Sequence, residues 1–222
     1  MAMTDEEYML RAVELAKKGT GWTNPNPLVG AVIVKGGRII GEGYHKKYGG
    51  LHAEREALAS ANEDVSGATI YVTLEPCCHY GKQPPCVNAI IEAGIKRVVI
   101  GSYDPNPLVA GKGVDILREH NITVDDKLVC SEECKSLNYV FFNYIKEKKP
   151  YVILKYAQSL DGKIATHTGL SQWITGETAR NKVHMDRHRY SAVMVGVETV
   201  IKDNPMSVSY THLRAHETRH DL

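Results

Sequence analysis

The feature that most constrains the fold is a set of side chains that must meet although the sequence separates them. His52-Ala53-Glu54 precedes Pro76-Cys77, and Cys86 follows after eight further residues. One imidazole and two thiolates are the ligands of a catalytic zinc ion whose fourth position stays open for water. Glu54 is not needed as a ligand and is placed to move protons. The sequence therefore predicts a fold that brings these residues together at a hydrolytic zinc site.

Taken singly, each of these residues has a simpler interpretation. A lone cysteine is usually a small buried hydrophobe, and a lone histidine usually has no chemical role. Together they form the pattern His-x-Glu, Pro-Cys and a second cysteine, which is typical of zinc-dependent deaminases. Cys78 adjoins Cys77, so its side chain should point away from a shared ligand position. Cys130 and Cys134 lack a partner pair, and no second zinc site is expected there.

Composition excludes several classes of protein. Lys and Arg number 27 against 26 Asp and Glu, so no strong overall charge attracts nucleic acid or a membrane surface. Five cysteines are an odd number for a disulfide framework, and the chain is long enough to bury a core without one. Residues 1–18 show no secretory signal, and no apolar run approaches the ~18 residues of a membrane span. We expect a cytoplasmic protein.

Apolar spacing and turn residues predict an α/β/α fold with a mixed sheet. Thr4 to Glu7 form a capping box ahead of a first helix that ends at Gly19. The expected strands are Leu28–Val34, Ile39–Tyr44, Ala68–Leu74, Arg97–Ile100 and an edge strand at Ile122–Val129. The expected helices are His52–Ala61, Cys86–Ala93 and Gly113–Glu119.

This arrangement has a consequence for the metal site. His52 and Cys86 lie at helix starts, where the backbone N–H groups and the helix dipole favour negative charge. Cys77 follows directly after a strand. Ligand sites of α/β folds lie at the carboxyl edge of the sheet, so we expect the three ligands to converge there.

A second region follows the basic linker Lys146–Pro150. Its pattern predicts a strand over Tyr151–Ala157, a helix over Thr178–Arg189 and a buried strand over Ala192–Val197. Residues 209–222 carry three histidines, two threonines and two arginines without periodicity, which predicts a non-native tail over 207–222. His212, His216 and His220 are spaced four apart, but nothing nearby supplies the supporting groups of a metal site.

Longer motifs resemble one known family, the bacterial bifunctional riboflavin-biosynthesis deaminase/reductases. They include Asn24-Pro25-Asn26-Pro27-Leu28-Val29-Gly30, Thr73-Leu74-Glu75-Pro76-Cys77, Pro84-Pro85-Cys86, Asp104-Pro105-Asn106-Pro107-Leu108-Val109-Ala110-Gly111 and Ser159-Leu160-Asp161-Gly162-Lys163-Ile164-Ala165. The resemblance runs from the first helix to Pro205. After that the sequence departs from the family pattern.

The resemblance implies two domains with successive reactions. Residues 1–146 would form a cytidine-deaminase-like domain that hydrolyses the 2-amino group of a diaminopyrimidinone carrying a ribosylamino 5′-phosphate. Residues 151–206 would form the first part of a dihydrofolate-reductase-like domain, which in the family reduces the ribosyl group with NADPH. We expect this second domain to be incomplete in the present sequence and unable to carry out the reduction.

The resemblance also implies roles for individual residues. In the deaminase domain these are the Zn²⁺ ligands His52, Cys77 and Cys86, the proton shuttle Glu54, and the substrate-binding residues Asn26, His45, His79 and Lys82. In the second domain they are the substrate-binding residues Ser171 and Arg187 and the NADPH-binding residues Ala157, Trp173, Thr199 and Asp203. Without the family, Trp173 would be interpreted as a core aromatic and Arg187 as a surface charge. The expected partner is a small phosphoribosyl pyrimidine, with no nucleic acid or membrane and with homo-oligomers left open.

Two other functions fit part of the pattern. A deaminase of bases in tRNA or single-stranded DNA would need a basic groove with stacking aromatics, whereas this chain has only two Trp and two Phe beside twelve Tyr. Such enzymes typically carry Pro-Cys-x-x-Cys, without the long loop seen here. A structural zinc module would need a fourth protein ligand, for which His79 is the candidate.

Overall fold

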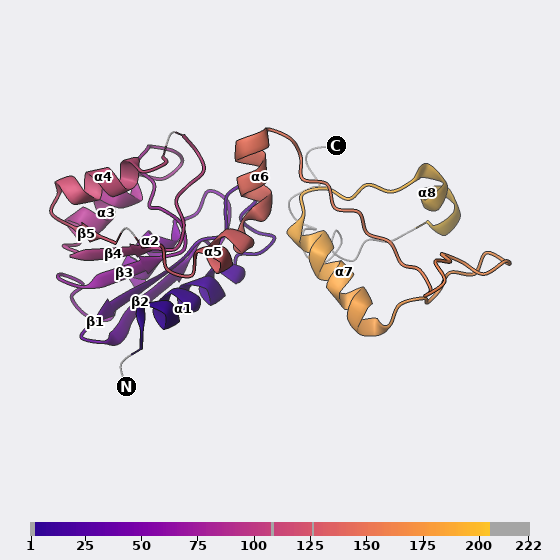
Figure 1. Ribbon diagram of the computed structural model, residues 1–222, viewed down its shortest axis with the longest axis horizontal. Helices are drawn as coiled ribbons and strands as arrows, with labels where there is room; N and C mark the ends of the chain where they lie inside the picture. Colours follow the sequence, from indigo (N-terminus) through magenta and orange to yellow (C-terminus); the bar gives the residue numbers. More distant parts are fainter. Residues whose placement is uncertain (1–2, 108, 126, 205–222) are drawn as a thin grey trace. The chain divides into compact units, whose positions relative to one another are not determined.

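The computed structural model describes residues 3–107, 109–125 and 127–204. The chain forms two compact units, Met1–Tyr151 and a second that begins at Val152. The first unit is built on a five-stranded sheet in the order β2-β1-β3-β4-β5 (Figure 1). The strands are β1 (Gly30–Lys35), β2 (Arg38–Tyr44), β3 (Thr69–Val72), β4 (Arg97–Ile100) and β5 (Thr123–Val124). β1 pairs antiparallel with β2 and β3, while β4 pairs parallel with β3 and β5, so the sheet is mixed as predicted.

Alternating side chains of the strands build two separate cores. Ile33, Ile70 and Ile100 face one side of the sheet, where they pack with apolar residues of α2 (Ala53–Ser60), α3 (Cys86–Glu92) and α4 (Lys112–Glu119). Val32 and Val99 face the other side, against α1 (Asp5–Lys17) and α5 (Ser131–Leu137). The period of two along each strand therefore produces the three-layer α/β/α arrangement seen in Figure 1.

Most elements of the first unit lie where the sequence predicts them. The capping box of α1 is present: Thr4 Oγ1 accepts from the Glu7 amide at 3.2 Å, and the Thr4 amide donates to the Glu7 carboxylate at 2.7 Å. The edge strand is much shorter than expected, at Thr123–Val124, the two described residues that pair in register with β4. Beyond them, Asp125 and Val129 each donate one backbone hydrogen bond of 3.3 Å to β4. Helix α6 (Tyr139–Glu147) covers residues to which the sequence analysis gave no element.

The second unit departs from expectation. Its helix α7 (Glu177–Arg189) is confirmed, and α8 (Val197–Asp203) follows. The strands predicted over 151–157 and 192–197 are wrong, since the described residues from 152 to 204 contain no strand. A strand needs a paired neighbour for its N–H and C=O groups, and none is present within this part of the chain. The predicted tail over 207–222 lies outside the described residues.

Apolar side chains of the second unit are largely exposed. Leu154 and Met194 are 83% and 93% exposed, and among residues 152–201 and 204, whose side chains are described, only His188 is buried. Across the described residues of both units, no helix is long and apolar enough to cross a bilayer.

Candidate zinc and substrate site

Three elements of the first unit place the predicted zinc ligands at one edge of the sheet. His52 is the N-cap residue of α2, and Cys86 is the first residue of α3. Cys77 lies in the loop that follows β3. Arg55 on α2 donates a hydrogen bond of 3.1 Å to the carbonyl of Pro85, which ties α2 to the residue before Cys86. The convergence of two helix starts and a strand end is confirmed.

The geometry of the three side chains fits a zinc ion. His52 Nδ1 lies 3.5 Å from Cys77 Sγ and 3.4 Å from Cys86 Sγ. A tetrahedral ion with Zn–N of about 2.0 Å and Zn–S of about 2.3 Å holds its nitrogen and sulfur ligands about 3.5 Å apart. All three ligand atoms lie within 4.8 Å of one another. His79 is exposed and does not belong to this group.

Protonation within the site favours metal binding. Hydrogen bonds from Cys86 and His52 lower the pKa of the Cys77 thiol to about 4 against the effect of burial. The nearby Cys77 sulfur and burial raise the pKa of Cys86, because two thiolates this close repel each other. A divalent cation between them removes that repulsion and favours both thiolates.

Glu54 is the buried acid of the site. Only 3% of its surface is exposed, and it lies one residue into α2, with its carboxyl in hydrogen-bonding reach of Cys86. Burial, followed by the charge of Cys77, raises the pKa of Glu54 to about 7. A carboxyl group with a pKa near neutrality can accept a proton and give it back in the same reaction.

His45 and Asn26 form a hydrogen-bonded pair beside the zinc ligands. His45 Nδ1 lies 2.9 Å from the Leu51 carbonyl, which can only accept, so this nitrogen carries the proton. Burial lowers the pKa of His45, and the neutral ring then accepts from the Asn26 amide at Nε2, over 3.1 Å. The ring of His45 packs edge-on against His52, with centroids 5.4 Å apart. The structure thus brings both predicted substrate-binding residues to the zinc site.

His79 and Lys82 are exposed on the loop between the two cysteines. The Lys82 ammonium lies 4.0 Å from the centre of the Tyr48 ring. The Gln83 side chain donates a hydrogen bond of 3.1 Å to the Gly49 carbonyl, so this loop is held against the segment that precedes His52. Lys82 presents a cation that has no carboxylate partner among its described contacts.

Sequence analysis gave no role to Glu75 or Asp104, although both stand in the quoted motifs. Glu75 is buried two residues before Cys77. Asp104 is partly buried after β4, where burial raises its pKa and the charges of His79 and Cys77 act on it. The signal that could have found them is their position: each follows a parallel strand at the edge where the ligands meet.

Among the described residues, the predicted substrate-binding and NADPH-binding side chains of the second unit are mostly exposed. Trp173 is 70% exposed with the Arg180 guanidinium 4.6 Å from its ring centre, and Arg187 approaches His184 Nδ1 at 3.5 Å. Ser171 and Thr199 are exposed, and Ala157 is half-buried. The Asp203 side chain lies outside the described residues. The roles of these residues stay predictions.

Two family models match the chain, one for each unit. Residues 2–102 match the cytidine and deoxycytidylate deaminase zinc-binding region, and residues 150–220 match the RibD C-terminal domain. The riboflavin biosynthesis protein RibD of Actinobacillus pleuropneumoniae is 62% identical over 92% of this chain and 54% of its own length. The RibD protein of Aquifex aeolicus is 57% identical over 90% of this chain and 56% of its own length.

The chain belongs to the RibD family of riboflavin biosynthesis proteins. It spans about half the length of the curated relatives it matches. The crystal structure of a Thermotoga maritima diaminohydroxyphosphoribosylaminopyrimidine deaminase/reductase is 58% identical, with a TM-score of 0.86 over 90% of this chain and 58% of that one. The Aspergillus oryzae Rib2 deaminase, at 24% identity and a TM-score of 0.53, shares the fold.

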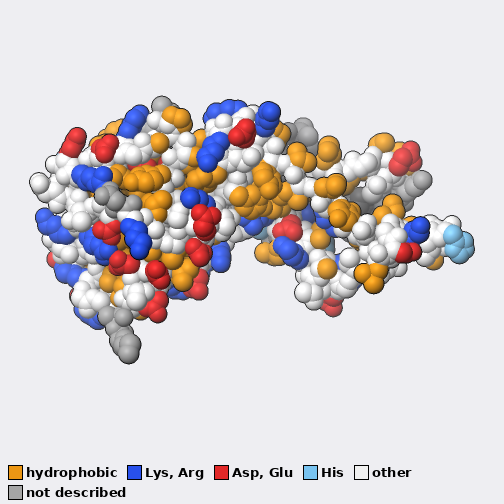
Figure 2. All heavy atoms as spheres, viewed as in Figure 1, with side chains coloured by type: hydrophobic (Ala, Val, Ile, Leu, Met, Phe, Trp, Pro, Cys, Tyr) orange, Lys and Arg blue, Asp and Glu red, His pale blue; other side chains and the backbone are white. Residues whose placement is uncertain are grey.

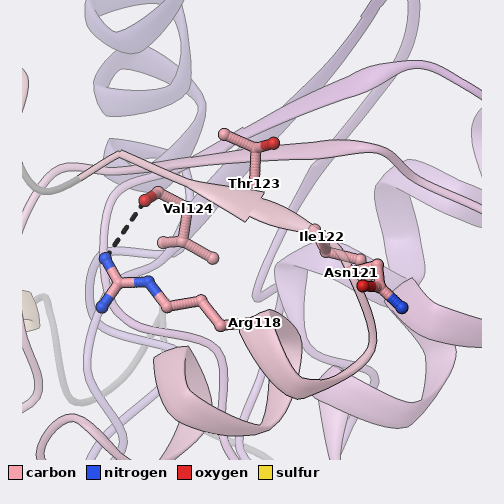
Figure 3. Close-up of a pocket in the computed structure, with 5 residues that line it drawn as sticks. All are labelled: Arg118, Asn121, Ile122, Thr123 and Val124. Carbon is pink, nitrogen blue, oxygen red and sulfur yellow. Dashed lines mark hydrogen bonds between the residues drawn. The ribbon is translucent and has the colours of Figure 1, made fainter.

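A separate hollow of about 400 Å³ lies at the other end of the parallel strands (Figure 3). Its lining is Arg118 with residues 121–124, and Arg118 is tied to the Val124 carbonyl at 3.2 Å. It contains none of the predicted site residues. Figure 2 shows basic and acidic side chains interspersed over the face of the first unit that it presents, without a large area of one sign.

Proposed function

We propose that the first unit is a zinc-dependent aminohydrolase acting on a diaminopyrimidinone that carries a ribosylamino 5′-phosphate. The observation that carries this proposal is the triangle of His52 Nδ1, Cys77 Sγ and Cys86 Sγ beside the buried Glu54. The ligand set leaves room for a substrate-side position, as catalytic zinc sites do. The Thermotoga relative's name supports the substrate class.

Each residue has a defined task in this hydrolysis. Zinc held by the three ligands would supply the chemistry of acidifying a water at neutral pH. Glu54 would take one proton of the water and give it to a ring nitrogen while the remaining hydroxyl adds to the carbon that carries the amino group. Glu54 would then take the proton of that hydroxyl and give it to the amino group, which leaves as ammonia as the C=O bond forms. Asn26, held by neutral His45, presents its amide to the base. Lys82 and His79 offer N–H donors to the phosphate or base edge.

The local structure favours a small substrate over nucleic acid. Lys82, on the loop between the two cysteines, lies over the ring of Tyr48. A single-strand binder stacks successive bases on aromatic rings along a basic groove. Such deaminases typically carry Pro-Cys-x-x-Cys, whereas eight residues separate Cys77 from Cys86 in this chain. A structural zinc module is disfavoured because His79 is exposed, away from the three-ligand group.

The test is ammonia release from the phosphoribosyl diaminopyrimidinone, with zinc measured on the same sample. We expect one zinc per chain and stoichiometric ammonia, with activity abolished by chelation and restored by added zinc. Cytidine, deoxycytidylate and a single-stranded oligonucleotide serve as alternative substrates. Preferred release from any of these, or zinc without release from the pyrimidinone, would contradict the proposal.

For the second unit we propose that this chain does not reduce the ribosyl group. A nucleotide cleft needs a packed sheet, whereas residues 152–204 contain no strand and His188 is the one buried residue among those whose side chains are described there. NADPH titration should therefore show no binding at micromolar concentrations and no oxidation in the presence of the deaminated product. Saturable NADPH binding at those concentrations would show that the unit holds a working cleft.

A further inference from the structure

Two carboxylates are buried in the described part of the chain, Glu54 and Glu75. Glu54 has a place in the proposed reaction, and Glu75 has none. Burying a carboxylate costs free energy unless several donors satisfy it. The Glu75 carboxylate is satisfied by backbone donors from a distant part of the chain.

Four backbone N–H groups donate to the Glu75 carboxylate. Oε1 accepts from Gly113 at 3.1 Å and from Val114 at 3.4 Å, and Oε2 accepts from Gly111 at 3.0 Å and from Asp104 at 3.4 Å. All four donors belong to the β4–α4 loop, defined here as the described residues 101–107 and 109–111, and to the first turn of α4. Both oxygens are thus used by a segment far from Glu75 in sequence.

The backbone of the two segments is joined as well. The Glu75 amide donates to the Ser102 carbonyl at 2.9 Å, and Ser102 Oγ donates to the Thr73 carbonyl at 3.1 Å. At Gly113 the approach is so close that a Cβ atom would lie 2.4 Å from the Pro76 carbonyl oxygen. The start of α4 therefore packs directly on the residues that lead to Cys77.

The β4–α4 loop borders the zinc site. Asp104 is half-buried and feels the charges of Cys77 and His79. Its carboxylate accepts from the Asn106 amide at 2.8 Å, which fixes the turn behind it. The backbone amide of Asp104 donates to the Glu75 carboxylate, so Glu75 holds the backbone of Asp104 in place.

We propose that Glu75 is a positioning residue that holds the β4–α4 loop, and with it Asp104, beside the zinc ligands where the substrate would bind. It acts through the loop and contacts neither metal nor substrate. The inference rests on the proposed aminohydrolase function. Removing the carboxylate should impair substrate binding while the zinc ligands keep their places.

Glu75→Gln is the direct test on the full chain. The oxygen of the new amide can still accept two hydrogen bonds, but the NH₂ group would face the other two backbone N–H donors. Two of the four hydrogen bonds to residue 75, here called the clamp, would therefore be lost. We expect zinc to stay at one per chain, KM for the phosphoribosyl pyrimidine to rise roughly 10-fold or more, and kcat to fall less. Glu75→Asp, which keeps the charge but withdraws it by one methylene, should give an intermediate KM.

Asp5→Asn is the matched control. Asp5 is a partly buried carboxylate that accepts from Arg97 and Tyr71, and none of its described contacts is to the site. It should lower stability while leaving KM unchanged. A Glu75→Gln protein with full zinc, lowered stability and an unchanged KM would overturn the proposal, because Glu75 would then be merely structural.

Amide hydrogen exchange on the unaltered chain tests the clamp without any variant. The first N–H groups of a helix lack partners inside the helix, so slow exchange at Gly113 and Val114 reports their bonds to Glu75. We expect both to be protected, together with Gly111. Exchange as fast as in an open loop would overturn the clamp. Failure of ammonia release with protected amides would instead contradict the proposed function alone.

Discussion

The two units contain similar apolar segments with opposite fates. In the first unit Ile33, Ile70 and Ile100 are fully buried, because each lies on a strand with paired neighbours and a helix above it. In the second unit Val193, Met194 and Val195 form an equally apolar run that is more than half exposed. An apolar run therefore becomes a strand only where neighbouring strands complete the sheet. The zinc site depends on that completion, since its ligands stand at the ends of sheet and helices.

The largest effect should come from the metal ligands. Cys86→Ser replaces a buried thiolate by a hydroxyl that does not ionise at neutral pH, so zinc and ammonia release should both fall to background. Cys78→Ser is the matched control, because Cys78 packs against the core and lies outside the ligand group. Zinc content by mass spectrometry and ammonia release should be normal in the control. Retention of zinc by Cys86→Ser would break the assignment.

Two isoleucines, one in each unit, test whether apolar side chains contribute differently to stability in the two units. Ile33 is fully buried, whereas Ile201 on α8 is 69% exposed. Ile33→Ala should lower the free energy of unfolding by about 2–5 kcal/mol. Ile201→Ala should change it by less than about 0.5 kcal/mol. Urea unfolding followed by circular dichroism measures both, and a comparable loss for Ile201→Ala would mean that the second unit has a core after all.

The smallest effect should come from the ion pair of Asp5 with Arg97. Hydrogen bonding to Arg97 lowers the pKa of Asp5 below its usual 3.8. A carboxyl group whose pKa is lower in the folded state stabilises the protein fully at pH values above its pKa in the unfolded chain. That contribution is lost as the pH falls through the pKa of the group in the folded protein. Since both side chains are about one-third exposed, Asp5→Asn should cost about 1 kcal/mol or less at neutral pH.

The pH dependence checks this sign. The difference in unfolding free energy between Asp5→Asn and the unaltered protein should be constant from neutral pH down to about 4 and should shrink below that. Urea titrations at a series of pH values provide the measurement. A difference that grows on acidification would mean that Asp5 is protonated in the folded protein.

Local signals were sufficient for much of the first unit. The capping box at Thr4 and the apolar spacing of the strands predicted elements that the structure contains, and His52, Cys77 and Cys86 converge as expected. The strands predicted over 151–157 and 192–197 were wrong because local pattern does not report whether a pairing partner exists. The role of Glu75 was hidden for a related reason, since its four donors lie far along the chain.

The most direct test of the central claim is Glu54→Gln, with zinc and turnover measured on the same sample. In the proposed reaction His52, Cys77 and Cys86 bind the metal, and Glu54, buried with a pKa of about 7, moves the protons. The variant should therefore keep one zinc per chain while ammonia release falls on the order of 10²–10⁴-fold. Loss of zinc from Glu54→Gln, or turnover close to that of the unaltered chain with zinc in place, would contradict the account.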